Sequence, residues 1–346
     1  MLFRQLFDAS SSTYSYLIAG RRGGEALIID PVLEKVDRYV ALLNDLDLRL
    51  VKAIDTHLHA DHVTGLGALR DRTRCVTVMG EMTTADVVSM RVAEGDVIEI
   101  DGVRLDVLYT PGHTDDSYSF VMPDRVFSGD TLLIRGTGRT DFQNGDPRAQ
   151  YDSIFGKLLK LPEATLLYPA HDYKGDTVST IGEERARNPR LQVRSVDEYA
   201  DLMNNLKLPN PKLMDVAVPA NRHIGLAQDR ADRIGLAPSA ARPIVAAGGA
   251  LLVDLREPAE RARRAIPESS VHTPYRELAD ALAEGGLLTT LARATGKRLL
   301  FICAYGERSA MAVEAARAAG FQDAVHVIGG LNAWAGQTTF SPSPGS

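Results

Sequence analysis

Three histidines and an aspartate fall within six residues, as His57, His59, Asp61 and His62. The apolar segment 52–55 precedes them and predicts a buried strand. In an extended chain successive side chains alternate in direction, so His57 and His59 point to one side. Converging imidazole and carboxylate groups suit zinc, iron or manganese. This segment therefore predicts a metal site at the end of a strand, with Asp61 and His62 opening the next helix.

Three more donors follow predicted strands elsewhere in the chain. His113 stands in a turn after segment 104–109, Asp130 follows segment 125–127, and His171 follows segment 165–168. Side chains on loops at strand ends are where sites in α/β proteins usually form. Further strands are expected at 16–19, 26–30, 75–79, 97–100 and 118–122, with a hairpin turn at 20–24 and a helix at 35–46. The pattern indicates sheets flanked by helices rather than an all-β barrel.

A change in composition marks residues 209–243, which contain five prolines among small residues. We interpret this stretch as the tail of a first domain followed by a linker. Strands are then expected at 250–255, 298–303 and 324–327, with helices at 275–282, 287–295, 309–319 and 331–334. This is a compact parallel α/β pattern of about 100 residues. The sequence therefore predicts two α/β domains, residues 1–235 and 240–346.

Bulk properties narrow the class of protein. The 346 residues carry a formal charge of -6 without a basic stripe, so nucleic acid is not expected as a partner. No apolar run reaches the length of a membrane span, and the N-terminus shows no secretory signal. Two cysteines do not form a disulfide framework, which predicts a cytoplasmic protein with free thiols. A homodimer is the default expectation for a soluble enzyme.

The histidine pattern resembles the metallo-β-lactamase superfamily. The segments that carry the resemblance are Thr56–His62, Pro111–Thr114, Ser128–Asp130 and Pro169–Asp172, and it spans about residues 1–235. It implies an αβ/βα sandwich of two sheets. In that superfamily the full donor set holds two zinc ions bridged by Asp130, as in glyoxalase II, a thioester hydrolase of glutathione conjugates. Spacing alone favours this two-zinc arrangement.

Segments 134–143, 171–173 and 218–221 resemble the persulfide dioxygenase branch of that superfamily more closely. The resemblance implies one Fe(II) per chain, held by His57, His113 and Asp130. The other four donors would then support these ligands: His59, Asp61, His62 and His171. The implied substrates are glutathione persulfide and O2, and the products are sulfite and glutathione. Arg139 and Tyr173 are candidates for binding the tripeptide, although Arg139 has the alternative of pairing with Asp141.

Cys303 ends a predicted strand and precedes a helix, where free backbone N–H groups stabilise a thiolate. Arg308 adds positive charge and Gly306 eases the turn. These features suit a sulfur nucleophile that forms a persulfide, and the alternative is an inert buried cysteine. Cys75 lies inside an apolar strand and receives no role.

Segments 253–257, 303–309 and 329–334 resemble a rhodanese domain, whose active loop reads C-x-x-G-x-R. The resemblance implies transfer of sulfane sulfur among thiosulfate, sulfite and glutathione persulfide through Cys303 and Arg308. One departure is segment 264–270, which lacks the His and Gly of the family's G-H-I-P-G-A-like segment. The favoured hypothesis is a persulfide dioxygenase fused to a rhodanese. The alternatives are a dizinc glutathione thioesterase with a non-catalytic C-terminal module, and a C-terminal domain that binds or senses sulfur.

Overall fold

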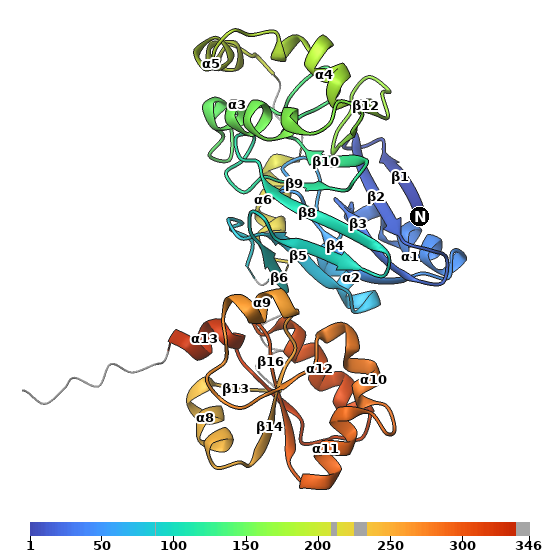
Figure 1. The fold of residues 1–346 in the computed structure, drawn as a ribbon, viewed down its shortest axis with the longest axis vertical. Coiled ribbons are helices and arrows are strands. Elements are labelled where there is room, and N and C mark those ends of the chain that lie inside the picture. The colour runs from blue at the N-terminus through green and yellow to red at the C-terminus, as the bar shows by residue number, and fades with distance from the viewer. Residues whose placement is uncertain (87, 209–212, 225–233, 337–346) are drawn as a thin grey trace, which may run out of the picture. The chain divides into compact units, whose positions relative to one another are not determined.

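The computed structural model describes residues 1–86, 88–208, 213–224 and 234–336. The chain folds into two units, each with its own core (Figure 1). The first unit comprises Met1–Asp86 and Arg91–Ile224, and the second comprises Val87–Met90 and Gly225–Ser346. Among the described residues, no helix combines the length and apolar character needed to cross a bilayer.

Two six-stranded sheets form the N-terminal unit. The first has the order β1 (Leu2–Asp8), β2 (Thr13–Ala19), β3 (Glu25–Ile29), β4 (Arg49–Ile54), β5 (Val76–Gly80) and β6 (Met90–Val92). The second has the order β12 (Ser179–Thr180), β11 (Leu166–Pro169), β10 (Arg125–Gly129), β9 (Tyr118–Val121), β8 (Val103–Tyr109) and β7 (Val97–Ile100). The two-sheet α/β fold expected for this part of the chain is confirmed, and the predicted hairpin joins β2 to β3 as antiparallel neighbours.

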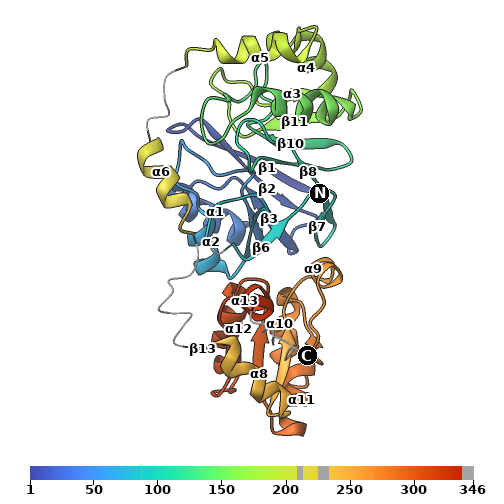
Figure 2. The same ribbon diagram turned by 90° about the vertical axis from the view of Figure 1, so that its left-hand side faces the viewer.

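Helices cover the sheets and bury one face each. The helices of this unit are α1 (Val36–Asp45), α2 (Leu66–Thr73), α3 (Pro147–Gly156), α4 (Ile181–Arg187), α5 (Val196–Asn204) and α6 (Met214–Asn221). In α1 the buried residues Val36, Tyr39 and Leu43 recur at helical spacing, which gives the helix one apolar face. Helices α3, α4 and α5 pack together over β10 and β11 in both Figure 1 and Figure 2.

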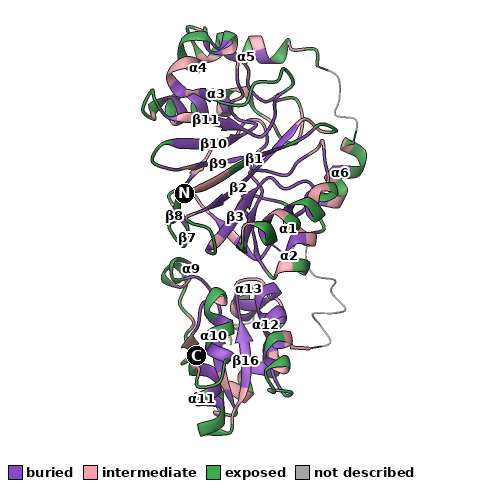
Figure 3. Ribbon diagram, turned by 90° about the vertical axis from the view of Figure 1, so that its right-hand side faces the viewer, coloured by how far each residue is buried: buried purple, intermediate pink, exposed green. Residues whose placement is uncertain are grey.

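The C-terminal unit is a five-stranded parallel sheet with helices on both faces. The strand order is β13 (Gly235–Leu236), β17 (Val325–Val327), β16 (Arg298–Ile302), β14 (Ala250–Asp254) and β15 (Val271–His272). One face packs against α10 (Leu278–Leu282), α11 (Leu287–Thr295) and α12 (Glu307–Ala318), and the other against α8 (Pro238–Ala246) and α13 (Gly330–Gly336). A short helix, α9 (Pro258–Arg263), follows β14. Cover on both faces explains the continuous apolar runs of β14 and β16, which are buried in Figure 3.

The interpretation of residues 209–243 as tail and linker is wrong in part. Residues 214–221 form α6, and residues 238–246 form α8. Pro238 occupies the first turn of α8, where the missing N–H costs nothing. Because β13 pairs with β17, residue 235 already belongs to the C-terminal sheet. Three of the five prolines, Pro219, Pro238 and Pro243, therefore lie in helices, and the other two are outside the described residues.

Candidate metal centre and thiol site

The predicted metal donors all lie on loops at strand ends. His57, His59, Asp61 and His62 come after β4, His113 after β8, Asp130 directly after β10, and His171 after β11. A β-bulge between Phe127 and Gly129 turns the chain just before Asp130. Segment 57–62 consists of bends, and α2 begins only at Leu66, so the expected helix start at Asp61 and His62 is wrong.

His57, His113 and Asp130 converge on one point. Their nearest donor atoms all lie within 4.8 Å of one another. His113 Nε2 is 3.6 Å from Asp130 Oδ2, and the rings of His57 and His113 are 5.0 Å apart. Two imidazoles and one carboxylate on one side of an ion form the facial arrangement that leaves other positions open.

Each of these three side chains is anchored through the atom that does not face the others. His57 Nδ1 lies 3.0 Å from Thr56 Oγ1, and His113 Nδ1 donates to the carbonyl oxygen of Arg139 at 2.7 Å. Thr56 gives its own proton to Asp30, so the ring of His57 must donate. In a neutral ring with its proton on Nδ1, Nε2 is the atom that carries the lone pair for a metal. Burial, reinforced by neighbouring imidazoles, holds the pKa of His57 well below its usual value, which keeps the ring neutral.

His171 bridges two carboxylates. Its Nδ1 lies 2.7 Å from Asp130 Oδ1 and its Nε2 lies 2.7 Å from Asp61 Oδ2. Burial opposes a charge on this ring, but Asp130 and Asp61 outweigh it and raise the pKa of His171 well above its usual value. Through Nδ1, His171 holds Oδ1 of Asp130, while Oδ2 of the same carboxylate faces His113.

His59 and His62 are held differently. His59 Nε2 pairs with Asp30 Oδ1 at 3.1 Å, and although burial disfavours the charge, Asp30 raises the pKa of His59 to about 9. His62 Nδ1 lies 3.0 Å from Asp61 Oδ2. Within the described part of the chain, His59 Nδ1 and His62 Nε2 are buried atoms without a hydrogen-bond partner. They form with Asp61 a second convergent group of donors. The structure therefore divides the seven donors into two groups and the bridging His171.

This centre is positioned by three residues that the sequence did not predict as site residues. Asp30, with φ of 50°, accepts from the Thr56 N–H at 2.7 Å as well as from its hydroxyl. Asn221 donates to the carbonyl oxygens of His59 and His62, both at 2.9 Å. Thr13 lies 3.0 Å from His171 Nε2. Asp30 could have been found as an acidic residue that ends a predicted apolar strand, whereas nothing in the sequence distinguishes Thr13.

A cavity of about 750 Å³ lies against the donors and is lined by His57, His113 and Asp130. The cations that line it are Arg135, Arg139, Lys174 and Arg190. Arg139 lines the cavity while its guanidinium pairs with Asp141 at 2.6 and 2.7 Å, so the expected alternative of a structural pair is present. Tyr173 is 71% exposed and stacks nearly parallel to the ring of His171. The cavity can accept an anionic molecule next to the converging donors.

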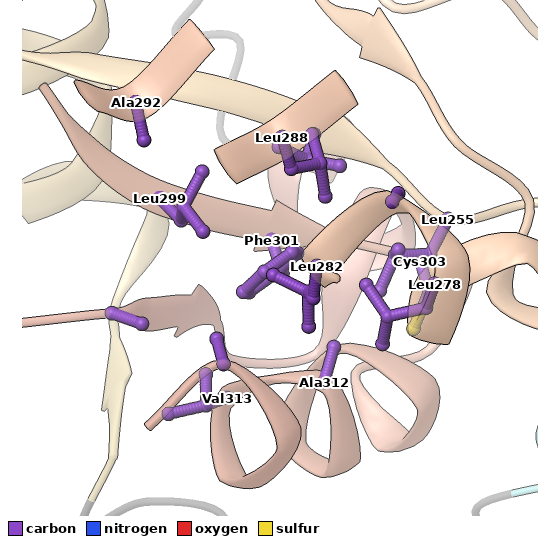
Figure 4. Close-up of a cluster of buried hydrophobic side chains, with 14 residues drawn as sticks. Leu255, Leu278, Leu282, Leu288, Ala292, Leu299, Phe301, Cys303, Ala312 and Val313 are labelled. Atoms are coloured by element: carbon purple, nitrogen blue, oxygen red, sulfur yellow. The ribbon is translucent and has the colours of Figure 1, made fainter. Parts of the chain in front are cut away.

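Cys303 follows β16 and is fully buried in the apolar cluster that Figure 4 shows, together with Leu255 and Leu278. The N–H of Gly306 donates to its sulfur at 3.1 Å, as expected for a turn that stabilises a thiolate. Gly306 has φ of 101°, a conformation that favours glycine. Arg308 is buried too, and both ends of its guanidinium pair with Glu260 at 2.7 Å. The arginine thus braces the loop through α9.

Segment 264–270, which differs from the family's G-H-I-P-G-A-like pattern, has a structural role. Glu268, where the family pattern has glycine, accepts from the indole N–H of Trp334 at 3.2 Å and pairs with Arg242 at 3.3 Å. Ile266 packs against the core cluster on the same side of the sheet. The side chain therefore ties α8 to α13, away from the Cys303 loop.

Two sheets with metal donors at their strand ends define a member of the metallo-beta-lactamase superfamily, whose family model matches residues 10–171. A rhodanese-like domain model matches residues 237–337. The mitochondrial persulfide dioxygenase ETHE1 of Mus musculus is 45% identical over 229 residues, which cover 65% of this chain and 89% of that protein. The crystal structure of ETHE1 from Myxococcus xanthus superposes with a TM-score of 0.63 at 53% identity and covers 64% of this chain and 98% of its own.

The chain therefore belongs to the persulfide dioxygenase family within that superfamily and continues into a rhodanese-like domain. A more distant relative is the hydroxyacylglutathione hydrolase of Rhodopseudomonas palustris. It is 34% identical over 205 residues, which cover 57% of this chain and 76% of that protein.

Proposed function

We propose that the N-terminal domain, which ends at Ile224 in the structure rather than at the predicted residue 235, oxidises glutathione persulfide with O2 and one Fe(II) held by His57, His113 and Asp130. The overall reaction converts glutathione persulfide, O2 and water into glutathione, sulfite and two protons. Bound iron would supply open coordination positions for O2 and the substrate sulfur and the redox chemistry that couples them. The observation that carries the proposal is the anchoring of each ligand by the atom it does not offer to the metal.

His171 is the observation that favours one metal over two. Both nitrogens of His171 are hydrogen-bonded to carboxylates, so in this arrangement neither nitrogen is offered to a second ion beside Asp61 and Asp130. We assign His59, Asp61, His62 and His171 to holding and orienting the ligands. The protein then contributes by orienting the ligands. Thr56, Arg139 and His171 hold His57, His113 and Asp130 in place before the metal or the substrate binds.

The cavity supports an anionic thiol persulfide as substrate. Glutathione carries two carboxylates, and the cavity wall carries four cations. Arg139 can accept a carboxylate by exchanging Asp141, which is more than half exposed. Tyr173 offers an exposed aromatic face beside His171.

We further propose that the C-terminal domain, residues 240–346, passes sulfane sulfur through a Cys303 persulfide, with Arg308 holding the loop. Thiosulfate or sulfite and glutathione persulfide would be its substrates, and the reaction is reversible in principle. Two sites on one chain raise the local concentration of the shared intermediates. We also propose a cytoplasmic homodimer that binds neither nucleic acid nor membrane, which fractionation and sedimentation test.

Metal analysis of protein made without added metal is the decisive experiment. We expect about one iron per chain and O2 uptake with glutathione persulfide. His57→Ala, His113→Ala and Asp130→Ala should each lose iron, whereas His59→Ala and His62→Ala should lower turnover more than metal content. Two zinc ions per chain without O2 uptake would instead establish the thioesterase alternative, to which the unpartnered His59 Nδ1 and His62 Nε2 would contribute ligands.

A further inference from the structure

Side chains from two neighbouring strands and one helix meet at the Cys303 sulfur. Side chains two residues apart on a strand share a face, so Cys303 lies on the same face as Phe301. Phe301 of β16 pairs with His326 of β17, which places the imidazole on that face as well. The first turn of α12 covers this face and brings Ser309 between them.

The three polar groups form a continuous hydrogen-bonded chain. Ser309 Oγ is 3.5 Å from Cys303 Sγ and 3.2 Å from His326 Nδ1. Ser309 and Cys303 are fully buried, and His326 is 1% exposed. Buried polar groups of this kind are held in one arrangement, because each depends on its neighbours for its hydrogen bonds.

The direction of these bonds follows from the surrounding carbonyl groups. His326 Nδ1 also lies 3.2 Å from the carbonyl oxygen of Val327, which can only accept, so Nδ1 carries a proton. The single Nδ1 proton is shared between the Val327 carbonyl and Ser309 Oγ, so the serine accepts from His326 and its own proton is available to another partner. In the thiol form that partner is the carbonyl oxygen of Gly306, at 2.9 Å. When Cys303 ionises, rotation of the hydroxyl turns the same proton toward the sulfur.

We infer that Ser309 and His326 prepare Cys303 for sulfur transfer: the Ser309 hydroxyl donates to the ionised sulfur, and His326 holds that hydroxyl from the neighbouring strand. The inference rests on the sulfurtransferase function proposed above. In the thiol form the Cys303 S–H donates to Ser309 Oγ, and the Gly306 N–H donates to the sulfur. After ionisation and rotation of the hydroxyl, the sulfur would have two donors, the Gly306 N–H and the Ser309 O–H. Hydrogen bonds to the charged form favour that form.

The reaction that this arrangement serves transfers the outer sulfur of thiosulfate to Cys303. Cys303 releases its proton to solvent, and the thiolate attacks the outer sulfur of thiosulfate. The S–S bond of thiosulfate breaks, sulfite leaves with the bonding electron pair, and Cys303 keeps a persulfide with one negative charge. The donors that stabilise the thiolate also face the persulfide. Charged or titratable groups on the elements around the sulfur include Asp254, Arg256, Glu257, Glu260, Tyr275, Tyr305, Glu307, Arg308 and His326, and α12 also carries Glu314 and Arg317.

The test measures ionisation of Cys303 in the full-length protein. Alkylation by iodoacetamide is followed against pH, and the modified Cys303 peptide is quantified by mass spectrometry. Ser309→Ala should raise the midpoint of the profile by about one pH unit, which slows alkylation about tenfold below the midpoint. Ser309→Thr keeps the hydroxyl and should keep the wild-type midpoint. The fluorescence of Trp334, in the same unit, verifies that each variant is folded.

Variants of His326 separate positioning from packing. His326→Leu should raise the midpoint by about half as much as Ser309→Ala, and His326→Asn should restore it, because an asparagine amide can replace the Nδ1 donor. His272→Leu is the matched control: His272 bonds the Arg256 carbonyl at 2.9 Å and should leave the midpoint unchanged. Equal midpoints for wild type and Ser309→Ala would overturn the inference. Failure of thiosulfate to form a persulfide on wild-type Cys303 would instead overturn the proposed function, in a separate measurement.

Discussion

Asn221 holds the metal-binding loop from a helix more than 150 residues away in the sequence. Its amide nitrogen donates to the carbonyl oxygens of His59 and His62, both at 2.9 Å, and its oxygen accepts from the Thr64 N–H at 2.8 Å. The side chain is 2% exposed. All three bonds go to backbone groups of the non-helical loop that follows β4.

Asn221→Ala removes all three bonds at once. Each buried backbone group left unpaired costs ~1–3 kcal/mol, and water entering the vacated space recovers part of that cost. We therefore expect the free energy of unfolding of the N-terminal unit to fall by ~3–5 kcal/mol. Because the loop carries His57, metal affinity should fall ~10–100-fold, the range typical for loss of a residue that orients ligands.

The two units offer separate signals for this measurement. Trp334 is the single tryptophan and lies in the C-terminal unit, so its fluorescence reports that unit alone. Far-ultraviolet circular dichroism follows both units, and the variant should shift only the transition that fluorescence does not detect. Metal affinity is measured by competition with a chelator under conditions where the variant is folded.

Asn188→Ala is the matched control. Asn188 is fully buried and donates to the carbonyl of Gly136 at 2.9 Å and to Glu184 at 2.9 Å, but it does not contact the loop after β4. It should lower stability by a similar amount and retain metal affinity. Wild-type affinity in Asn221→Ala, or an equal loss in Asn188→Ala, would refute the assignment of Asn221 to the metal loop.

Three other predictions follow from the same geometry. Glu260→Gln leaves Arg308 as a buried unpaired charge and should destabilise the C-terminal unit by ~3–5 kcal/mol, read from Trp fluorescence. Burial opposes ionisation of Glu260, but Arg308 outweighs it and holds the pKa of Glu260 below its usual 4.5. The stability that this ion pair adds is complete above pH 4.5 and is lost as the pH falls through the lower pKa of the folded state. The loss of stability in acid should therefore be smaller in Glu260→Gln than in the wild type. Gly138→Ala places a Cβ 2.1 Å from the Asp130 carbonyl oxygen and should reduce metal content, whereas the same change at the open position Gly156 should not. Cys303→Ser should abolish thiosulfate-dependent transfer and leave O2 uptake with glutathione persulfide intact; surviving transfer would show that the nucleophile is elsewhere.

The location of the metal site follows from the sequence because few residue types bind metals and strand ends can be predicted. His57, His113 and Asp130 lie where their flanking strands predict. The sequence does not predict which of the seven donors bind the metal and which orient the ligands. That difference depends on backbone atoms, which every residue type carries. The carbonyl of Arg139 orients His113, and any residue at that position supplies the same carbonyl.

Helices were harder to predict than strands. The helix over Val36–Asp45 has a clear apolar stripe, and the expected range of 35–46 is close to it. Helices α3 and α6 have weak periodicity, and prolines near or inside them obscure the pattern. In α3, Asp146 caps the helix by accepting from the Arg148 N–H, and Pro147 follows at the first helical position. An aspartate followed by a proline is typical of a helix start, but no helix was predicted here.

The way Arg139 serves the metal centre has an evolutionary consequence. Its carbonyl oxygen fixes His113, while its guanidinium pairs with Asp141 and the residue lines the cavity. The two contributions reside on different atoms, and only one of them changes when the side chain is replaced. Under the proposed function, a point mutation here can therefore alter which persulfide is accepted while the orientation of the metal ligand His113 is retained. At this position, substrate range and metal binding can therefore change independently. A lineage can acquire a new substrate while the metal site is retained.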